Sequence, residues 1–209
     1  MARDQELFDA IARGDRKTTK KLVTAAVDRE EDVEVMLADS MIPAMRHVGD
    51  RFGRNEIYVP EMLIAARAMQ AALDIIEPIL ADTGHEPVGK ICIGTVMGDL
   101  HDIGKNLVVI MLKGAGYEVL DLGTNCDVKK YQAAVDEGAK AVCCSALLTT
   151  TMPYMKEVVN HFLDHPDTPV FIGGAPVSQG FADEIKADGY AEDASKAVQV
   201  ISGTLGITV

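Results

Sequence analysis

The pattern of hydrophobic positions changes its period near Leu80. Before that point, apolar residues recur every three or four positions, which is the period of a helix with one buried face. The first such stretch stops at Gly14, and Asp15 is a suitable N-cap for a second helix that runs towards Asp28. The N-terminal part therefore begins with two amphipathic helices.

Two further helices follow in the same part. The third extends from Asp32 to about Arg51, and Pro43 inside it predicts a kink or a locally rebuilt turn. Pro60 suits the first position of a fourth helix. Short connections between four short helices predict a small four-helix bundle. The fourth helix carries its apolar side at Met62, Leu63, Ala66, Met69, Leu73 and Ile76.

A polar stretch with Gly and Pro, residues 81–89, separates this bundle from the rest of the chain and reads as a linker. We therefore divide the chain into a helical domain, residues 1–85, and a second domain, residues 86–209.

In the second domain, apolar strand-like runs alternate with helix-like runs. This alternation predicts an α/β domain with a doubly wound parallel sheet, and the expected strand order is the flavodoxin-like (Rossmann-like) 2-1-3-4-5. The strands are expected at 90–96, 117–121, 140–145, 168–172 and 188–191, and the helices at 104–115, 128–138, 152–164, 178–187 and 193–206.

Composition narrows the environment and the partners. The 209 residues are 48% hydrophobic and 25% charged, which is globular, and the net charge is −12. Nucleic acid and anionic membranes need clustered positive charge, so we expect neither as a partner. The N-terminus lacks an apolar signal core and no apolar run has membrane-spanning length, which predicts a cytoplasmic protein.

The four cysteines show no CxxC spacing. Cys92, Cys143 and Cys144 lie in apolar runs and are expected to be buried and reduced. Cys126 lies in a more polar turn, where we expect a loop thiol, ordinary or reactive.

The chemistry concentrates in the run Gly98-Asp99-Leu100-His101-Asp102-Ile103-Gly104. It follows the first predicted strand, at the sheet edge where open α/β proteins bind ligands. A lone loop histidine is more often a surface residue. Here, however, Asp99 could accept one ring N–H of His101 and leave the other nitrogen free to bind a metal. Gly98 and Gly104 leave room for a large flat ligand.

No second metal ligand accompanies His101. His47, His85, His161 and His165 form no pair with each other or with cysteines at zinc-site spacing. One protein ligand cannot hold a bare ion, but it can complete the coordination of a metal inside a macrocycle. The sequence thus favours a metallocofactor over an ion site.

Two more loops reach the same edge. Residues 144–151 follow the third strand, and Gly173-Gly174 follow the fourth. Their small and hydroxyl side chains could line a slot for a polar, nucleotide-like tail, although Gly-Gly also ends strands in any α/β domain.

Together these runs match the DxHxxG…SxL…GG signature of cobalamin-binding domains. The first element is Asp99 to Gly104, the second is Ser145-Ala146-Leu147 and the third is Gly173-Gly174. The N-terminal half, through 48–52, 58–60 and 65–69, resembles the helical cap that precedes this domain in cobalamin-dependent methionine synthase. The chain is thus similar to the corrinoid proteins of methanol, methylamine, glycine-betaine and aryl-methyl-ether methyltransferase systems.

The resemblance implies roles for individual residues. His101 corresponds to the lower axial cobalt ligand, Asp99 to the carboxylate that hydrogen-bonds it, and Thr151 to a serine that completes a relay. In the cap, Phe52, Tyr58 and Met62 are the expected contacts with the upper face of the corrin. The other expected cofactor-binding residues are Gly98, Asp102, Ile103, Gly104, Ser145, Leu147, Thr149, Gly173, Gly174, Tyr190, Ala191, Glu192, Asp193 and Ala194.

The function implied is that of a methyl carrier with cobalamin or a related corrinoid as cofactor, in forms such as methylcobalamin and hydroxocobalamin. A substrate-specific methyltransferase would load the methyl group, and a second one would pass it to tetrahydrofolate, a pterin or a thiol. A reductive activator protein is a further implied partner. The chain has no room for a substrate barrel, so we expect a shuttle subunit, and whether it counts as an enzyme is open.

Other classes share parts of the pattern. The histidine motif also occurs in adenosylcobalamin mutases, which lack this cap, and in cobalamin-based sensors, which carry a DNA-binding or signalling domain. A receiver or flavin-binding domain would fit the topology alone. A receiver needs an acidic cluster and a later lysine, whereas the fourth-strand loop here offers only Gly-Gly-Ala-Pro.

Overall fold

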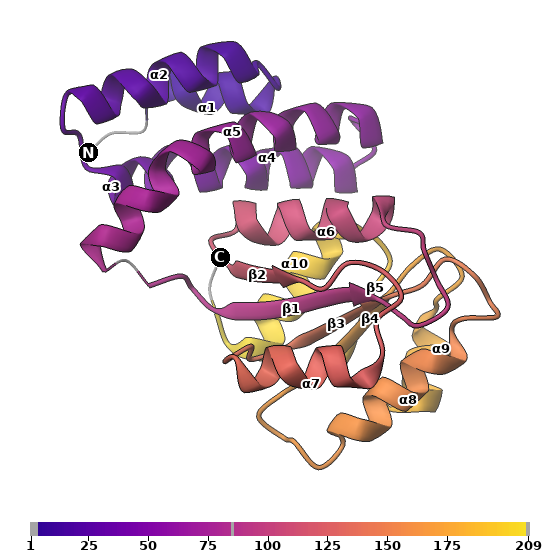
Figure 1. Ribbon diagram of the computed structural model, residues 1–209. Coiled ribbons are helices and arrows are strands. Elements are labelled where there is room, and N and C mark those ends of the chain that lie inside the picture. Colours follow the sequence, from indigo (N-terminus) through magenta and orange to yellow (C-terminus); the bar gives the residue numbers. More distant parts are fainter. Residues whose placement is uncertain (1–3, 85, 208–209) are drawn as a thin grey trace. The chain divides into compact units, whose positions relative to one another are not determined.

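The computed structural model describes residues 4–84 and 86–207 (Figure 1). The chain separates into two compact units, Met1–Glu86 and Pro87–Val209. Residue 85, the last of the predicted helical domain, lies outside the described residues.

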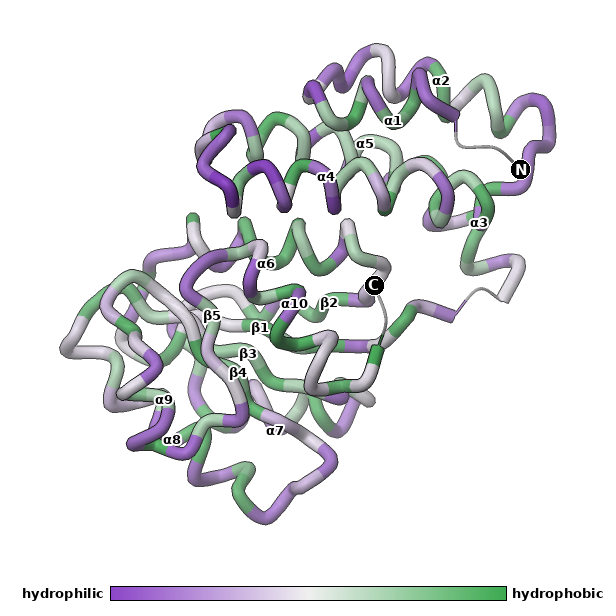
Figure 2. Tube along the Cα trace, turned by 180° about the vertical axis from the view of Figure 1, so that it is seen from behind, coloured by the Kyte–Doolittle hydropathy of each residue, from purple (hydrophilic) through white to green (hydrophobic). Residues whose placement is uncertain are grey.

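The first unit is helical. Its elements are α1 (Gln5–Ala12), α2 (Arg16–Asp28), α3 (Val33–Met36), the π-helical turn η1 (Leu37–Met41), α4 (Ile42–Gly53) and α5 (Val59–Thr83). The predicted cap is confirmed, because an Asp15 carboxylate oxygen accepts the Thr18 N–H at 3.0 Å. Asp4 and Asp32 cap α1 and α3 in the same way. Along α2, hydrophobic positions recur between hydrophilic ones (Figure 2), and Val23 and Ala26 are buried.

The predicted third helix is one continuous helical segment made of α3, η1 and α4. The rebuilt turn expected near Pro43 is the π-turn that directly precedes it. Proline has no N–H to donate and its ring crowds the carbonyl four residues back, so a wider turn accommodates it. Ser40 of this turn is buried, and its hydroxyl accepts the Asp4 N–H at 2.9 Å.

Helix α5 is longer than predicted. It begins at Val59, one residue before Pro60, and runs for 25 residues until Gly84 ends it in the left-handed conformation with φ 73°. The predicted linker therefore loses its first three residues, 81–83, to the helix. Their polarity does not interrupt a helix, whereas a left-handed glycine does.

The second unit is the predicted sheet. Strands β1 (Lys90–Thr95), β2 (Glu118–Asp121), β3 (Val142–Ser145), β4 (Val170–Gly173) and β5 (Gly189–Ala191) are all parallel, in the order β2-β1-β3-β4-β5. This confirms the fold class and the strand order. The helices are α6 (Ile103–Gly114), α7 (Val128–Asp136), α8 (Pro153–Phe162), α9 (Gln179–Ile185) and α10 (Ala194–Leu205).

The helices cover both faces of the sheet. Helices α6 and α10 lie on one face, and α7, α8 and α9 lie on the other (Figure 1). Alternate strand residues, such as Cys92, Cys144 and Ile172, pack with Tyr131 of α7 and Met155 of α8 in one buried cluster. Burial on both faces is why the strands read as continuous apolar runs.

All four cysteines are buried and form no disulfide. This confirms the expectation for three of them but corrects the one for Cys126, whose side chain is also fully buried. Its thiol donates to the Leu122 carbonyl at 3.2 Å, and burial raises the pKa of Cys126. A reactive loop thiol is thereby excluded.

Strand register aligns the carboxyl ends of four strands. Thr95 pairs with Ser145, Ser145 with Gly173, and Gly173 with Ala191. The loops that follow these residues therefore leave the sheet from one row. Within the described ranges, no helix combines the length and the apolar character needed to cross a membrane.

Candidate functional site

The centre of the candidate site is the Asp99 side chain, in the loop between β1 and α6. It is completely buried and accepts five hydrogen bonds. Oδ1 accepts from the His101 N–H at 3.0 Å and from His101 Nδ1 at 2.7 Å. Oδ2 accepts from the Thr151 hydroxyl at 2.7 Å and from the Leu147 and Leu148 N–H groups at 2.8 and 3.3 Å. One carboxylate thus joins the loops after β1 and β3.

These donors keep Asp99 ionised. Burial by itself raises the pKa of Asp99, but hydrogen bonds from the Leu147 and His101 N–H groups, the Thr151 hydroxyl and the His101 ring outweigh it. The pKa of Asp99 therefore lies well below its usual range. An ionised carboxylate only accepts hydrogen bonds, so Nδ1 of His101 must carry the proton.

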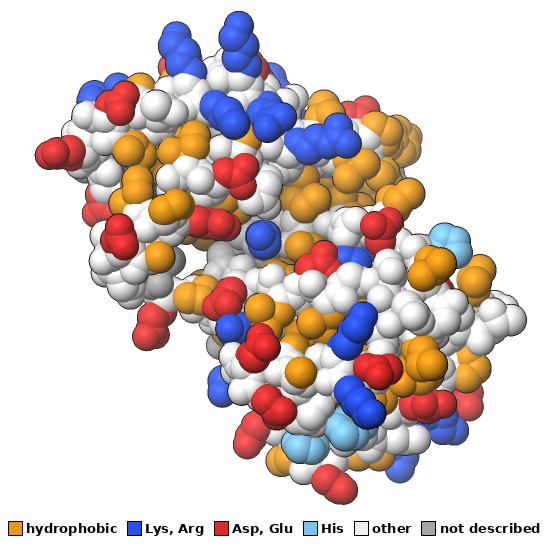
Figure 3. Space-filling view, in the orientation of Figure 1, with side chains coloured by type: hydrophobic (Ala, Val, Ile, Leu, Met, Phe, Trp, Pro, Cys, Tyr) orange, Lys and Arg blue, Asp and Glu red, His pale blue; other side chains and the backbone are white. Residues whose placement is uncertain are grey.

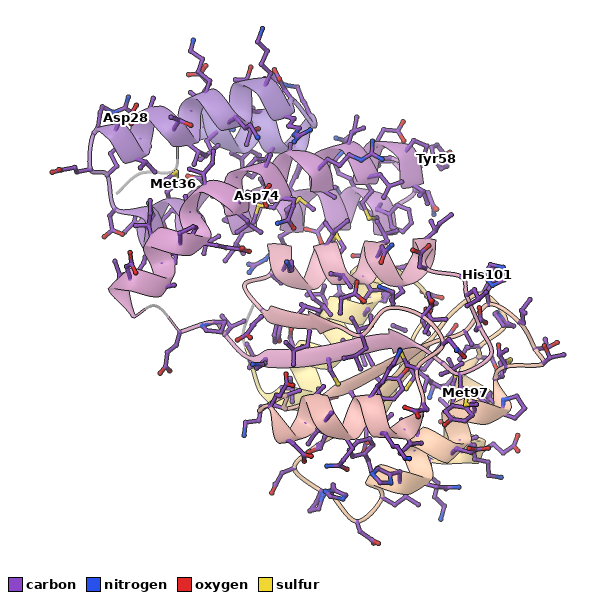
Figure 4. The ribbon with its side chains drawn as sticks, in the orientation of Figure 1. Asp28, Met36, Tyr58, Asp74, Met97 and His101 are labelled. Carbon is purple, nitrogen blue, oxygen red and sulfur yellow. The ribbon has the colours of Figure 1, made fainter. Side chains whose placement is uncertain are left out.

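The tautomer of His101 follows from this pair. With the proton on Nδ1, a neutral ring has its free lone pair on Nε2. The His101 side chain is 50% exposed, and it projects from the loops at the carboxyl ends of the strands (Figure 4). Among the described residues, none hydrogen-bonds to Nε2. This nitrogen is therefore available to a ligand from outside the unit.

The Thr151 hydroxyl has two acceptors within reach. Oγ1 lies 2.7 Å from Asp99 Oδ2 and 2.9 Å from the Leu148 carbonyl. A hydroxyl has one proton, so only one of these bonds is made at a time. The side chain is buried, so water does not replace the unused bond.

Two residues that the sequence did not indicate, Thr95 and Asn125, hydrogen-bond the backbone of the loop that contains His101. The buried Thr95 hydroxyl donates to the His101 carbonyl at 2.8 Å. The Asn125 side-chain oxygen accepts the Gly98 N–H at 2.8 Å, and the backbone N–H of Asn125 donates to the Asp99 carbonyl at 3.0 Å. Asn125 has a φ of 56°, which asparagine tolerates better than most residues. An asparagine in a turn was the available signal, but it did not say which loop Asn125 would contact.

The predicted glycines differ in what they permit. A Cβ on Gly174 would lie 1.9 Å from the Ala146 carbonyl oxygen, and its φ of 134° disfavours any side chain. Gly98 has a φ of 84°, and a Cβ there meets only ordinary contact with Thr151. At Gly104 a Cβ would meet open space. Gly174 is therefore needed for close packing of two loops, whereas Gly104 leaves the surface beside His101 open.

An apolar surface adjoins His101. Hydrophobic side chains reach the surface of this unit (Figure 3), and five exposed ones belong to the loops on either side of the Asp99 carboxylate and to the first residue of α6. They are Met97, Leu100, Ile103, Leu147 and Leu148, with exposed fractions between 41% and 73%. We call these five residues the apolar collar. An exposed nitrogen ligand beside an apolar collar fits a metal in a flat, largely apolar macrocycle.

The remaining predicted residues are placed as follows. Ser145 ends β3 and is half-buried, and Thr149 is exposed in the loop after it. Asp193 caps α10 by accepting the Lys196 N–H at 2.8 Å, so this residue has a structural task as well. The other members of that loop and motif are Asp102 and Glu192, which are exposed, Tyr190 and Ala191, which are half-buried in β5, and Ala194, which is buried.

Phe52, Tyr58 and Met62 belong to the helical unit. Phe52 lies in α4 and is half-buried, Tyr58 precedes α5 and is 65% exposed (Figure 4), and Met62 of α5 is buried. Their role as corrin contacts stays a prediction, which exposure favours most for Tyr58.

No group of three or more His, Cys, Asp or Glu side chains that could hold an ion occurs in the part of the chain that the structure describes. Any metal that binds Nε2 of His101 would therefore need its other ligands from a cofactor; the role of His101 as a metal ligand stays a prediction.

Comparison with known proteins gives consistent results. Two family models, each described as a B12 binding domain, match residues 4–77 and 89–199. A corrinoid protein of Desulfitobacterium hafniense is 39% identical over 208 residues, with 96% of each chain covered. A dimethylamine corrinoid protein of Methanosarcina acetivorans is 38% identical over 202 residues, 93% of this chain and 92% of that protein. In the methanol:cobalamin methyltransferase complex of Methanosarcina barkeri, one chain matches with TM-score 0.84 and 28% identity, over 98% of this chain and 80% of that one.

Proposed function

We propose that this chain, which belongs to the family of B12-binding corrinoid proteins, carries a methyl group on the cobalt of a bound corrinoid between two methyltransferases. The observation that carries the proposal is the Asp99–His101 pair, because it presents a metal-binding nitrogen beside an apolar collar. His101 would be the protein's cobalt ligand, and Asp99 and Thr151 would act behind it.

The corrinoid supplies the cobalt that accepts and donates the methyl group. The protein's part is to hold the His101 ring in one tautomer and one orientation. The buried carboxylate of Asp99 holds the proton on Nδ1, so the lone pair of Nε2 on this half-exposed side chain is left for the cofactor.

Thr151 orients the carboxylate of Asp99 from the side away from His101. While Asp99 is ionised, the Thr151 hydroxyl donates to Oδ2. The Leu148 carbonyl, 2.9 Å from Oγ1, is the alternative acceptor for the same hydroxyl proton. Threonine thus offers the same donor and acceptor as the serine expected at this position.

The nucleotide-like tail of the corrinoid would lie along the loops after β3, β4 and β5. We assign it the surface around Ser145, Leu147, Thr149, Gly173 and Gly174, together with residues 190–194. Strand register supports this assignment, because Ser145, Gly173 and Ala191 occupy one row.

We assign residues 1–85 to a cap and residues 86–209 to the cobalamin-binding domain, which are joined by the connection that follows Gly84. Phe52, Tyr58 and Met62 are the proposed cap contacts with the corrin. The two family models support two domains, since each matches one side of this connection.

The proposed partners follow from the reaction. A substrate-specific methyltransferase would supply the methyl group, as the name of the methanol:cobalamin methyltransferase complex indicates for a matched protein. The further partners are a second methyltransferase acting on tetrahydrofolate, a pterin or a thiol, and a reductive activator. The partner enzyme would select the methyl donor.

The proposal is tested by the His101→Gly variant loaded with hydroxocobalamin. We expect loss of the nitrogen ligand from the visible spectrum and at least about a tenfold slower methyl transfer, because metal sites lose this much even through outer partners. The matched control is His161→Gly, which removes an exposed histidine in the last turn of α8, whose Nε2 lies 2.7 Å from Gln132 Oε1. Unchanged spectra and transfer in His101→Gly would overturn the proposal.

A further inference from the structure

A second charged side chain is buried close to His101. Lys105 lies in the first turn of α6, four residues after His101, and is only 2% exposed. Its ammonium donates to Asp121 Oδ1 and Oδ2 at 2.5 and 2.6 Å and to Asn106 Oδ1 at 2.6 Å. All three donors are therefore used. Lysine is rarely buried unless it is paired, so this position is costly to maintain for packing alone.

Helix α6 lacks the usual cap at its start. The side chain of Asp102, the N-cap residue, accepts no backbone N–H of the helix and instead accepts from Asn106 Nδ2 at 3.1 Å. Lys105 fixes the start of the helix in another way, because its ammonium binds the first turn of α6 to Asp121 at the end of β2.

The same carboxylate also reaches the other end of the His101 loop. Asp121 Oδ1 accepts the Gly123 N–H at 2.9 Å, and the Gly123 carbonyl accepts the Thr95 N–H at 2.9 Å. The Thr95 hydroxyl in turn donates to the His101 carbonyl at 2.8 Å. Asp121 thus connects to both ends of residues 96–102, through Lys105 on the helix side and through Thr95 on the strand side.

We propose that Lys105, through its ion pair with Asp121, is a positioning residue that fixes the backbone of His101 relative to the cofactor. Asp99 sets the tautomer of the His101 ring, and the Lys105–Asp121 pair fixes the position of the backbone from which the ring extends. This inference rests on the proposed function of His101 as a cobalt ligand.

A matched control lies at the starts of β1 and β2, at the edge of the sheet opposite to the His101 loop. Lys90 and Glu118 form a lysine–carboxylate pair at 2.9 Å between the first residues of β1 and β2, with side chains 27% and 46% exposed. Lys90→Met removes a lysine of the same strand pair without touching the His101 loop.

The experiment compares Lys105→Met, Asp121→Asn, the double variant and Lys90→Met, each loaded with hydroxocobalamin and reduced to Co(II). In protein labelled with ¹⁵N-histidine, nitrogen splitting in the electron paramagnetic resonance spectrum gives the ratio of His101-bound to unbound cobalt, because the label distinguishes the imidazole from the cofactor's own nitrogen base. We expect this ratio to fall about tenfold in Lys105→Met and in Asp121→Asn, as for other outer partners of metal ligands, and to stay unchanged in Lys90→Met. The double variant should fall no further than Lys105→Met.

A second readout uses the protein without a corrinoid. We expect the His101 backbone N–H, which donates to Asp99 Oδ1, to exchange its hydrogen with solvent about tenfold faster in Lys105→Met than in the wild type, and at the wild-type rate in Lys90→Met. If Lys105→Met folds and both readouts match the wild type, the inference is wrong and Lys105 is only structural. If Lys105→Met does not fold, Asp121→Asn decides, because the Asp121 side chain is 38% exposed and easier to replace.

Failure of the proposed function has a different signature. In that case the wild type and His101→Gly give the same cobalt spectra, whatever Lys105 does. Hydrogen exchange of the His101 backbone N–H in the corrinoid-free protein then still tests whether Lys105 positions His101.

Discussion

The two edges of the five-stranded sheet contain similar side chains but treat their charges differently. At the amino-terminal edge, the Lys90–Glu118 pair is partly exposed, and the exposed Asp188 accepts the Val170 N–H at 2.7 Å. At the carboxyl-terminal edge, Asp99 and Lys105 are buried. Both carboxylate oxygens of Asp99 accept hydrogen bonds, and the ammonium of Lys105 donates to Asp121 and Asn106.

The difference indicates where the molecule maintains a fixed geometry. An exposed ion pair contributes little and tolerates replacement, because water substitutes for the lost partner. A buried charge must find its partners within the protein, so its neighbours are held in place. The edge that buries charges is the edge at which, under the proposed function, His101 meets a metal in one orientation.

The largest expected effect is that of Gly174→Ala, which tests how closely the loops at the carboxyl edge pack. The added Cβ would meet the Ala146 carbonyl oxygen at 1.9 Å, at a φ of 134°. We expect a loss of about 4 kcal/mol in the free energy of unfolding of the sheet unit, measured by urea denaturation.

Gly203→Ala is the matched control. Gly203 lies inside α10, where an added Cβ meets no atom within 4 Å, so we expect a gain of about 0.5–1 kcal/mol. Equal stabilities of the two variants would contradict this account of the edge.

The next effect is that of Asp99→Asn. An asparagine amide cannot accept all five hydrogen bonds, because its NH₂ group would face N–H and O–H groups that are themselves donors. We therefore expect a loss of about 3 kcal/mol in the free energy of unfolding at neutral pH. The pKa of Asp99 is lowered in the folded protein, so its stabilisation is complete above the ordinary value of about 4 and disappears as the pH falls further.

The stability difference between wild type and Asp99→Asn should therefore be constant above about pH 4 and shrink below it. Urea denaturation at a series of pH values measures it. A difference that grows on acidification would mean that Asp99 is not ionised in the folded protein.

Thr151→Val has the smallest expected effect. Valine keeps the shape but removes the donor to Asp99 Oδ2, so we expect a loss of about 1–2 kcal/mol by thermal or urea denaturation. Thr151→Ser should retain most of the stability, since the hydroxyl remains. Thr149→Val, at an exposed position of the same loop, should change stability by less than about 0.5 kcal/mol. A serine variant as unstable as the valine variant would show that the methyl group, not the hydroxyl, matters.

Much of the fold and part of the site were predictable from local patterns. The alternation of strands and helices predicts a parallel sheet, and the observed strand and helix bounds of the sheet unit differ from the predicted ones by at most two residues at either end. The Asp99–His101 contact was also predictable, because the two residues are separated by one position and share a loop. Helix ends near polar residues, as at Thr83, were less predictable, since polarity alone does not end a helix.

What the sequence determined by itself is therefore local: the period of burial, the order of elements and the motif that contains His101. Only the tertiary structure decided which groups converge on that motif. Thr151 and Leu147 reach Asp99 because β1 and β3 pair with Thr95 beside Ser145, and Lys105 is buried because Asp121 ends the neighbouring strand. These contacts join residues 16 to 52 positions apart, and no pattern along the chain encodes a distance set by strand register.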